Sequence, residues 1–144
     1  MPILNYTTQI SVDKTIAEIQ TKLARAGARA ILADYDDDGN IKSLAFKLVI
    51  QEKEVGFKLP AEPDKILVLL KTQRGVAKKF QTDEQARRVA WRIIKDWVEA
   101  QLAIIETKMV KPEQVFLPYA ITRDGRTLYE SVVQNGMLLG GGEA

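Results

Sequence analysis

The chain has no histidine and no cysteine among its 144 residues. Histidine is the commonest general base near neutral pH and the commonest metal ligand. Without these two residue types the usual zinc sites, the Ser-His and Cys-His nucleophile pairs and thiol redox chemistry are all excluded. The chain also lacks both glycine-rich phosphate-binding motifs, the P-loop and the dinucleotide fingerprint. Enzymes built on carboxylates, lysine, tyrosine or magnesium remain open. We predict a non-enzymatic protein with no catalytic residues, no metal and no cofactor.

Long apolar runs are missing as well. No stretch approaches the roughly 18 apolar residues that a membrane span needs. The opening segment, Met1–Tyr6, lacks the basic and apolar parts of a secretory signal. An absence of cysteine fits a reducing compartment. These features predict a cytoplasmic protein that does not enter a membrane.

What the chain does contain predicts one α+β domain over residues 1–139. Alternating apolar positions predict four strands, and apolar residues at helical spacing predict a helix after the first strand and a short helix after the fourth. The expected order is β-α-β-β-β-α, an antiparallel sheet of about four strands. The predicted strands are Ile3–Ile10, Ala28–Tyr35, Ile41–Ile50 and Val55–Leu59.

An acidic turn lies between the second and third of these strands. Asp34–Gly39 matches the opening of an EF-hand calcium loop, but Ala45 stands where that loop needs a bidentate glutamate. We predict a hairpin turn at Asp36–Asn40 and no cation site.

The C-terminal half is expected to consist of a long helix, an arm and a tail. Thr82 and Gln85 have the spacing of a capping box and open a helix over about residues 82–108. The arm, about residues 112–139, is expected to hold a helical turn, a small hairpin around Arg123–Arg126 and a last helical turn. Residues 140–144 include three glycines and are expected to be a disordered tail.

The long helix is unusually apolar. Its polar residues fall in one narrow stripe and leave an apolar arc of roughly 250°, whereas an ordinary surface helix has an apolar arc of about 100° or slightly more. Either the C-terminal arm covers the second apolar face, or a second copy of the chain does, in a homo-oligomer. The residues expected at that oligomer interface are Trp91, Ile94, Val98, Leu102 and Ile105.

Basic residues are concentrated between positions 71 and 95. This segment carries a net charge of +6, whereas the rest of the chain carries −4. Such asymmetry favours a polyanionic partner, DNA or RNA, whose phosphates would meet the basic loop and the start of the long helix. Phe80 or Trp91 could stack on an unpaired base. The predicted phosphate-binding residues are Lys71, Arg74, Lys78, Lys79, Arg87, Arg88, Arg92 and Lys95.

A plainer interpretation is that these charges only keep an apolar helix soluble. Arg92–Asp96 and Lys95–Glu99 are spaced to pair along the helix, at about 0.2–0.5 kcal/mol each. Such pairs do not account for the other basic residues, such as Arg74 and Lys78, so both interpretations stay open.

Two resemblances concern function. Ala86–Trp97, Val115–Tyr119 and Asp124–Glu130 together resemble small uncharacterised proteins encoded in bacteriophages and prophages. This resemblance covers the C-terminal third and implies DNA-handling accessory proteins or proteins that blunt host defence. The α-β-β-β-α order from Asp13 to Leu70 is similar to that of the double-stranded-RNA-binding domain, but the lysine-rich start of that family's second helix is missing here.

These observations favour a nucleic-acid-binding accessory protein that acts as a homo-oligomer. Two alternatives remain. One is an interaction module or anti-defence inhibitor that binds a host protein through the long helix and the arm. The other is a nucleotide-binding protein that uses Arg87, Arg88 and Arg92 at a subunit interface.

Overall fold

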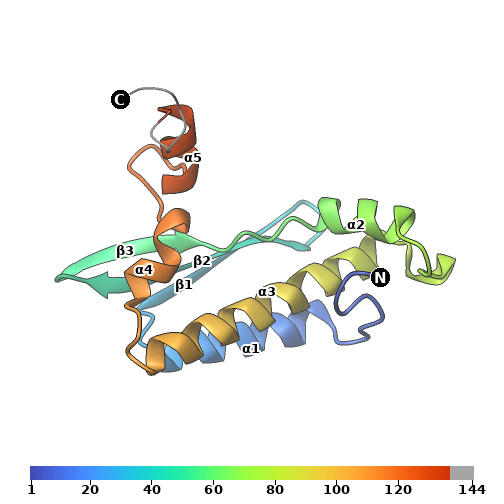
Figure 1. Ribbon diagram of the computed structural model, residues 1–144, viewed down its shortest axis with the longest axis horizontal. Coiled ribbons are helices and arrows are strands. Elements are labelled where there is room, and N and C mark those ends of the chain that lie inside the picture. Colours follow the sequence, from blue (N-terminus) through green and yellow to red (C-terminus); the bar gives the residue numbers. More distant parts are fainter. Residues whose placement is uncertain (137–144) are drawn as a thin grey trace. The chain divides into compact units, whose positions relative to one another are not determined.

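The computed structural model describes residues 1–136, so the predicted tail at 140–144 and the end of the predicted arm lie outside the described residues. The described chain is α+β, with five α-helices and one three-stranded antiparallel sheet (Figure 1). The elements in chain order are α1 (Val12–Arg25), β1 (Ala30–Tyr35), β2 (Ile41–Ile50), β3 (Lys53–Lys58), α2 (Pro63–Thr72), the 3₁₀ helix η1 (Lys78–Phe80), α3 (Asp83–Glu106), α4 (Pro112–Phe116), the 3₁₀ helix η2 (Leu117–Tyr119) and α5 (Leu128–Gln134).

The chain divides into two compact units, each built from two separate segments. The first unit combines Met1–Ala26 with Pro60–Ala103 and is helical. The second combines Gly27–Leu59 with the chain from Ile104 onward and contains the sheet. Each unit is described by itself below.

The sheet in the second unit has the strand order β1-β2-β3 with antiparallel pairing throughout. The predicted alternation along the central strand is confirmed, since Leu44, Phe46 and Leu48 are buried. Phe46 stacks on Phe57 at 5.4 Å between ring centroids, and Phe116 packs edge-on to Phe46 at 5.2 Å. This aromatic cluster is the apolar centre of the second unit.

The turns of the second unit follow their local chemistry. The predicted acidic turn is confirmed: the Asp36 carboxylate accepts hydrogen bonds from the backbone N–H groups of Asp38 and Asn40, both at 2.9 Å. The predicted hairpin in the arm is present as a single bridge between Ile121 and Thr127. The Thr127 side chain then caps α5.

In the first unit α1 and α3 lie side by side (Figure 1). The Ser11 hydroxyl caps α1, and Ile16, Ile19 and Leu23 form its buried face. The predicted long helix is confirmed as α3, with 24 residues. At about 100° per residue, its buried residues cover an arc of about 240° around the helix axis, so more than one face of α3 is buried. These buried residues are Gln85, Ala86, Val89, Ala90, Trp91, Ile94 and Val98.

The predicted first strand is wrong, and the sheet therefore has three strands instead of four. Residues 4–7 form a turn, and Asn5 has a φ of +67°, which interrupts extended backbone. The backbone carbonyls of Tyr6 and Thr8 accept hydrogen bonds from the Gln85 side-chain amide at 2.8 and 2.9 Å. One glutamine thus satisfies two alternate carbonyls that would otherwise need a neighbouring strand.

Replacing Gln85 by alanine tests this contact. Gln85 is only 3% exposed, so the variant leaves two carbonyls without their donor. We expect the free energy of unfolding to fall by about 2–3 kcal/mol, measured by urea denaturation. Gln101→Ala is the matched control, because Gln101 lies on the same helix and its side chain makes no hydrogen bond within residues 1–136. An equal loss in both variants would contradict the assignment.

Candidate nucleic-acid interface

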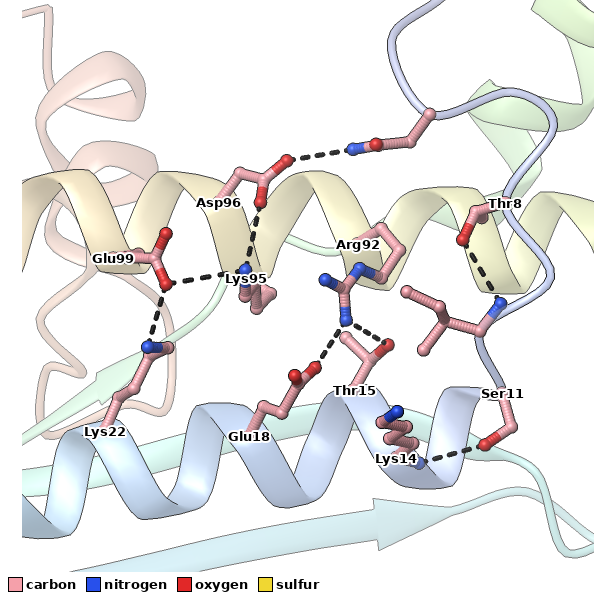
Figure 2. Close-up of polar contacts among 12 residues, drawn as sticks. Thr8, Ser11, Lys14, Thr15, Glu18, Lys22, Arg92, Lys95, Asp96 and Glu99 are labelled. Atoms are coloured by element: carbon pink, nitrogen blue, oxygen red, sulfur yellow. Dashed lines mark hydrogen bonds and ion pairs between the residues drawn. The ribbon is translucent and has the colours of Figure 1, made fainter.

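The polar stripe of α3 faces residues 5–22 of the chain. The Arg92 guanidinium pairs with the Glu18 carboxylate and donates to the Thr15 hydroxyl at 3.3 Å (Figure 2). The Arg92 side chain is 12% exposed. This arginine therefore joins α3 to α1 and is already occupied by a carboxylate.

The same stripe continues as a chain of ion pairs toward the end of α1 (Figure 2). Lys95 lies 3.4 Å from the carboxylates of both Asp96 and Glu99, and Lys22 of α1 lies 2.8 Å from Glu99. The Asn5 amide donates to Asp96 at 2.9 Å. The predicted Lys95–Glu99 pair is confirmed, whereas the predicted Arg92–Asp96 pair gives way to contacts with residues distant in sequence.

Arg88 is occupied as well. Its guanidinium lies 2.6 Å from the Glu84 carboxylate and donates to the Gln85 side-chain oxygen at 2.9 Å. Three of the eight predicted phosphate-binding residues, Arg88, Arg92 and Lys95, thus bind partners within the chain. Their role in this structure is to hold the first unit together.

The other five cations are different. They extend from the last turn of α2 through the loop and η1 into α3, and none of them forms an ion pair within residues 1–136. Four are exposed and Arg87 is half-buried. We call this set the basic loop surface: Lys71, Arg74, Lys78, Lys79 and Arg87.

A small apolar cluster underlies the basic loop surface. Leu70 of α2, Val76 of the loop and Ala86 of α3 are buried together, with Tyr6 and Phe80 packed against them. Each cation of the basic loop surface is a near neighbour in sequence of one of the three buried residues. The cluster therefore brings cations from three successive elements to one part of the first unit.

Polar contacts fix the loop from both sides. The Gln73 side-chain oxygen accepts from the backbone N–H of Ile3 at 2.7 Å, and the Gln81 side chain donates to the carbonyl of Val76 at 3.1 Å. The predicted flexible basic loop is therefore a packed segment whose lysine and arginine side chains project from a fixed backbone.

Two predicted features of the phosphate site do not fit the structure. Asp83 and Glu84 occupy the first turn of α3, where their negative charge opposes an anion at the helix N-terminus. Phe80 packs edge-on to Tyr6 at 5.9 Å, with the Lys79 ammonium 5.1 Å from its ring, and Trp91 is fully buried. Trp91 therefore offers no surface to a base, and the half-buried Phe80 ring is already in contact with Tyr6 and Lys79.

The predicted oligomer interface on the long helix also needs correction. Trp91, Ile94 and Val98 are buried within the chain, so these three side chains offer a second copy no surface. Leu102 and Ile105 are half-buried, and for these two positions the interface stays a prediction. A wide apolar arc cannot tell burial by the chain's own segments from burial by a partner.

A hollow of about 180 Å³ lies between the start of α2 and the middle of α3, and it is one place where a small ligand could bind. Ile66, Ala90, Ile93 and Ile94 are among its lining residues, with Glu62 and Lys65 paired at 3.2 Å. Arg87, Arg88 and Arg92, predicted for a nucleotide, do not line it. This hollow therefore gives no support to the predicted nucleotide site.

Residues 1–136 contain no group of three or more carboxylates that could hold a metal ion. Among the same residues no helix combines the length and the apolar character that crossing a bilayer requires. Comparison of the chain with protein-family models, curated proteins and solved structures found no match. The candidate interface therefore rests on the geometry described above.

Replacing arginines one at a time should separate structural cations from those without an ion pair. Arg92→Ala leaves Glu18 without its partner, and we expect the free energy of unfolding to fall by about 1–3 kcal/mol. Arg87→Ala should change it by less than about 0.5 kcal/mol. Chemical denaturation of both variants measures the difference, and equal losses would show that Arg87 too is part of the packing.

Glu99 should give stability a measurable pH dependence. Its hydrogen bond to Lys22, together with the charge of Lys95, holds its pKa below the ordinary value of 4.5. A lowered folded-state pKa contributes stability above the unfolded-state pKa, and this contribution is lost as the pH falls through the folded-state pKa. Glu99→Gln should therefore be less stable than the wild type at pH 7, with a difference that shrinks below about pH 4.5.

Thermal unfolding of the wild type and of Glu99→Gln, from pH 7 to below about pH 4.5, measures this difference in stability. The effect should be small, because the Glu99 side chain is half-exposed. Glu106→Gln is the control, since Glu106 lies on the same helix and forms no ion pair within residues 1–136. A difference from the wild type that stays constant with pH would contradict the linkage.

Proposed function

We propose that the protein is a non-enzymatic nucleic-acid-binding accessory protein that contacts the phosphate backbone through the basic loop surface. The observation that carries this proposal is the division of the eight cations. Three pair with carboxylates inside the first unit, whereas the other five, on a packed loop and its flanking helices, form no ion pair in the described part of the chain. Exposed or half-buried cations without a carboxylate partner, gathered over one apolar cluster, suit the phosphates of a polyanion.

The chemistry of the surface favours phosphate contact over base reading. Lysine and arginine bind backbone phosphates without regard to sequence, whereas base recognition needs side chains placed in a groove or rings for stacking. Trp91 is fully buried, and the half-buried Phe80 ring already contacts Tyr6 and the Lys79 ammonium. The proposed binding is therefore independent of sequence, and DNA and RNA are both candidate partners.

A second candidate function is binding to a host protein, as the phage resemblance implies. The observation that favours it is the apolar exposure of the arm. Leu117, Ile121, Tyr129 and Val133 are between 39% and 57% exposed, and α5 contributes no buried residue. Such a surface would bind an apolar partner, and its binding would survive high salt.

Charge reversal of the 3₁₀ helix tests the leading proposal. Lys78→Glu combined with Lys79→Glu should abolish binding to fluorescently labelled DNA and RNA duplexes and single strands. The control is Lys42→Glu combined with Lys53→Glu, which changes the net charge equally at exposed lysines of the sheet. Binding by the wild type should weaken with salt at a logarithmic slope of up to about −4.5 for duplex DNA and about −3.5 for single strands, if all five cations contact phosphates.

Two outcomes would reject this proposal. One is wild-type protein that binds none of the four ligands at low salt. The other is an equal loss of nucleic-acid binding in both double variants, which would indicate that binding depends on the net charge of the protein and not on the basic loop surface. A protein partner retained at high salt but lost in Tyr129→Lys would favour the second candidate.

A further inference from the structure

One edge of the sheet has no partner strand within residues 1–136. β2 pairs with β1 on one side and with β3 on the other, so the outer edge of β1 is open. The backbone N–H of Leu59 donates to the carbonyl of Leu44. From Leu44 onward, the backbone N–H and C=O groups of the even-numbered residues of β2 therefore point toward β3, and those of the odd-numbered residues point toward β1. By the register, Ile31 pairs with Phe46 and Ala33 with Leu44, so Ile31 and Ala33 direct their N–H and C=O groups outward.

The two edges of this sheet are treated differently. Beside β3, the N–H of Ile121 donates to the carbonyl of Gly56 at 2.8 Å, and Ala120 bridges Phe57, so the arm covers that edge. β1 has no such cover in the described part of the chain. Its six residues include no lysine, arginine, proline or glycine, and its one charged residue, Asp34, accepts a hydrogen bond from the Ser43 hydroxyl of β2. Leu32 and Tyr35 are 64% and 60% exposed.

The two ends of β1 carry opposite unpaired charges. Arg29 precedes the strand, is exposed and forms no ion pair within the described residues. Asp37 and Asp38 follow it, are exposed and likewise form no ion pair there. If two copies of β1 pair antiparallel, the positive start of each strand meets the acidic end of the other. Parallel pairing would place like charges together.

We propose that the open edge of β1 is a docking site for a second copy of this chain. The two β1 strands pair antiparallel across a two-fold axis at Leu32, and Ile31 of each copy exchanges backbone hydrogen bonds with Ala33 of the other. The side chains of the two Leu32 residues meet at the axis, where opposed residues without mutual hydrogen bonds approach closely. The two sheets become one six-stranded sheet. This interface is separate from the one predicted on the long helix and does not depend on nucleic-acid binding.

Sedimentation equilibrium of the full chain over a wide range of concentration tests the dimer. The wild type should reach the mass of two 16.1 kDa chains at high concentration. Leu32→Lys places two positive charges at the axis and should raise the dissociation constant by about tenfold or more. Val49→Lys is the control, because Val49 is a 45% exposed residue on the same face of the sheet but on the central strand.

Three further variants test whether the β1 edge forms the contact and whether a second copy of the chain occupies it. Ala33→Pro removes an N–H that faces outward in the monomer, so it should also block the dimer. Arg29→Asp should weaken the dimer, and adding Asp37→Arg with Asp38→Arg should restore it, because each copy then again meets the opposite charge. Circular dichroism checks that every variant folds, and the Arg29 series decides the matter if either β1 variant does not.

Three results would overturn the proposal. One is a wild type that stays a single chain at every concentration. Another is a dimer that responds equally to Leu32→Lys and Val49→Lys, since the contact would then lie elsewhere. The third is a different protein that co-purifies with the chain and is lost in Leu32→Lys, because the edge would then serve a foreign strand.

Discussion

The pairing of the polar stripe of α3 with residues 5–22 is the contact on which the first unit depends. α3 buries most of its circumference, and its remaining stripe is used as well. Gln85 donates hydrogen bonds to the carbonyls of Tyr6 and Thr8. Arg92 forms an ion pair with Glu18, and Glu99 forms one with Lys22. Tyr6, positioned in this way, packs against the apolar cluster that underlies the basic loop surface. The geometry of the candidate interface is therefore set by contacts in which no residue of the basic loop surface takes part.

Sequence patterns predicted those elements whose signal is local. The period-two alternation in β2, the acidic turn at Asp36 and the threonine before α3 each act through neighbours a few residues away. The segment Ile3–Ile10 shows the same alternation and yet is not a strand, because its alternate carbonyls meet a glutamine that lies far along the chain. Alternation shows that one side of a segment is covered, but it does not show whether a strand or a side chain covers it.

The candidate site shows the same limit. The sequence identifies a cluster of cations, but it cannot separate free cations from paired ones, because Arg92 finds its carboxylate in a helix near the start of the chain. The other two paired residues have local partners: Arg88 pairs with Glu84, and Lys95 pairs with Glu99 as its spacing predicted. The oligomer interface on α3 shows the same limit, since an apolar arc describes how much surface is covered and not which chain covers it. A signal for the open sheet edge was present in β1, whose six residues contain no lysine, arginine or proline.

The interleaving of the two units has a consequence for how the chain is made. Each unit joins a segment from the N-terminal part of the chain to another that is synthesised much later. On the ribosome α1 emerges with Glu18 unpaired, and it must wait for Arg92 before the first unit can close. The second unit is begun in that interval by the sheet but is completed only when Phe116 arrives. No single cut in the chain separates the two units, so neither can be obtained as a simple fragment, and contacts of such long sequence separation predict slow folding.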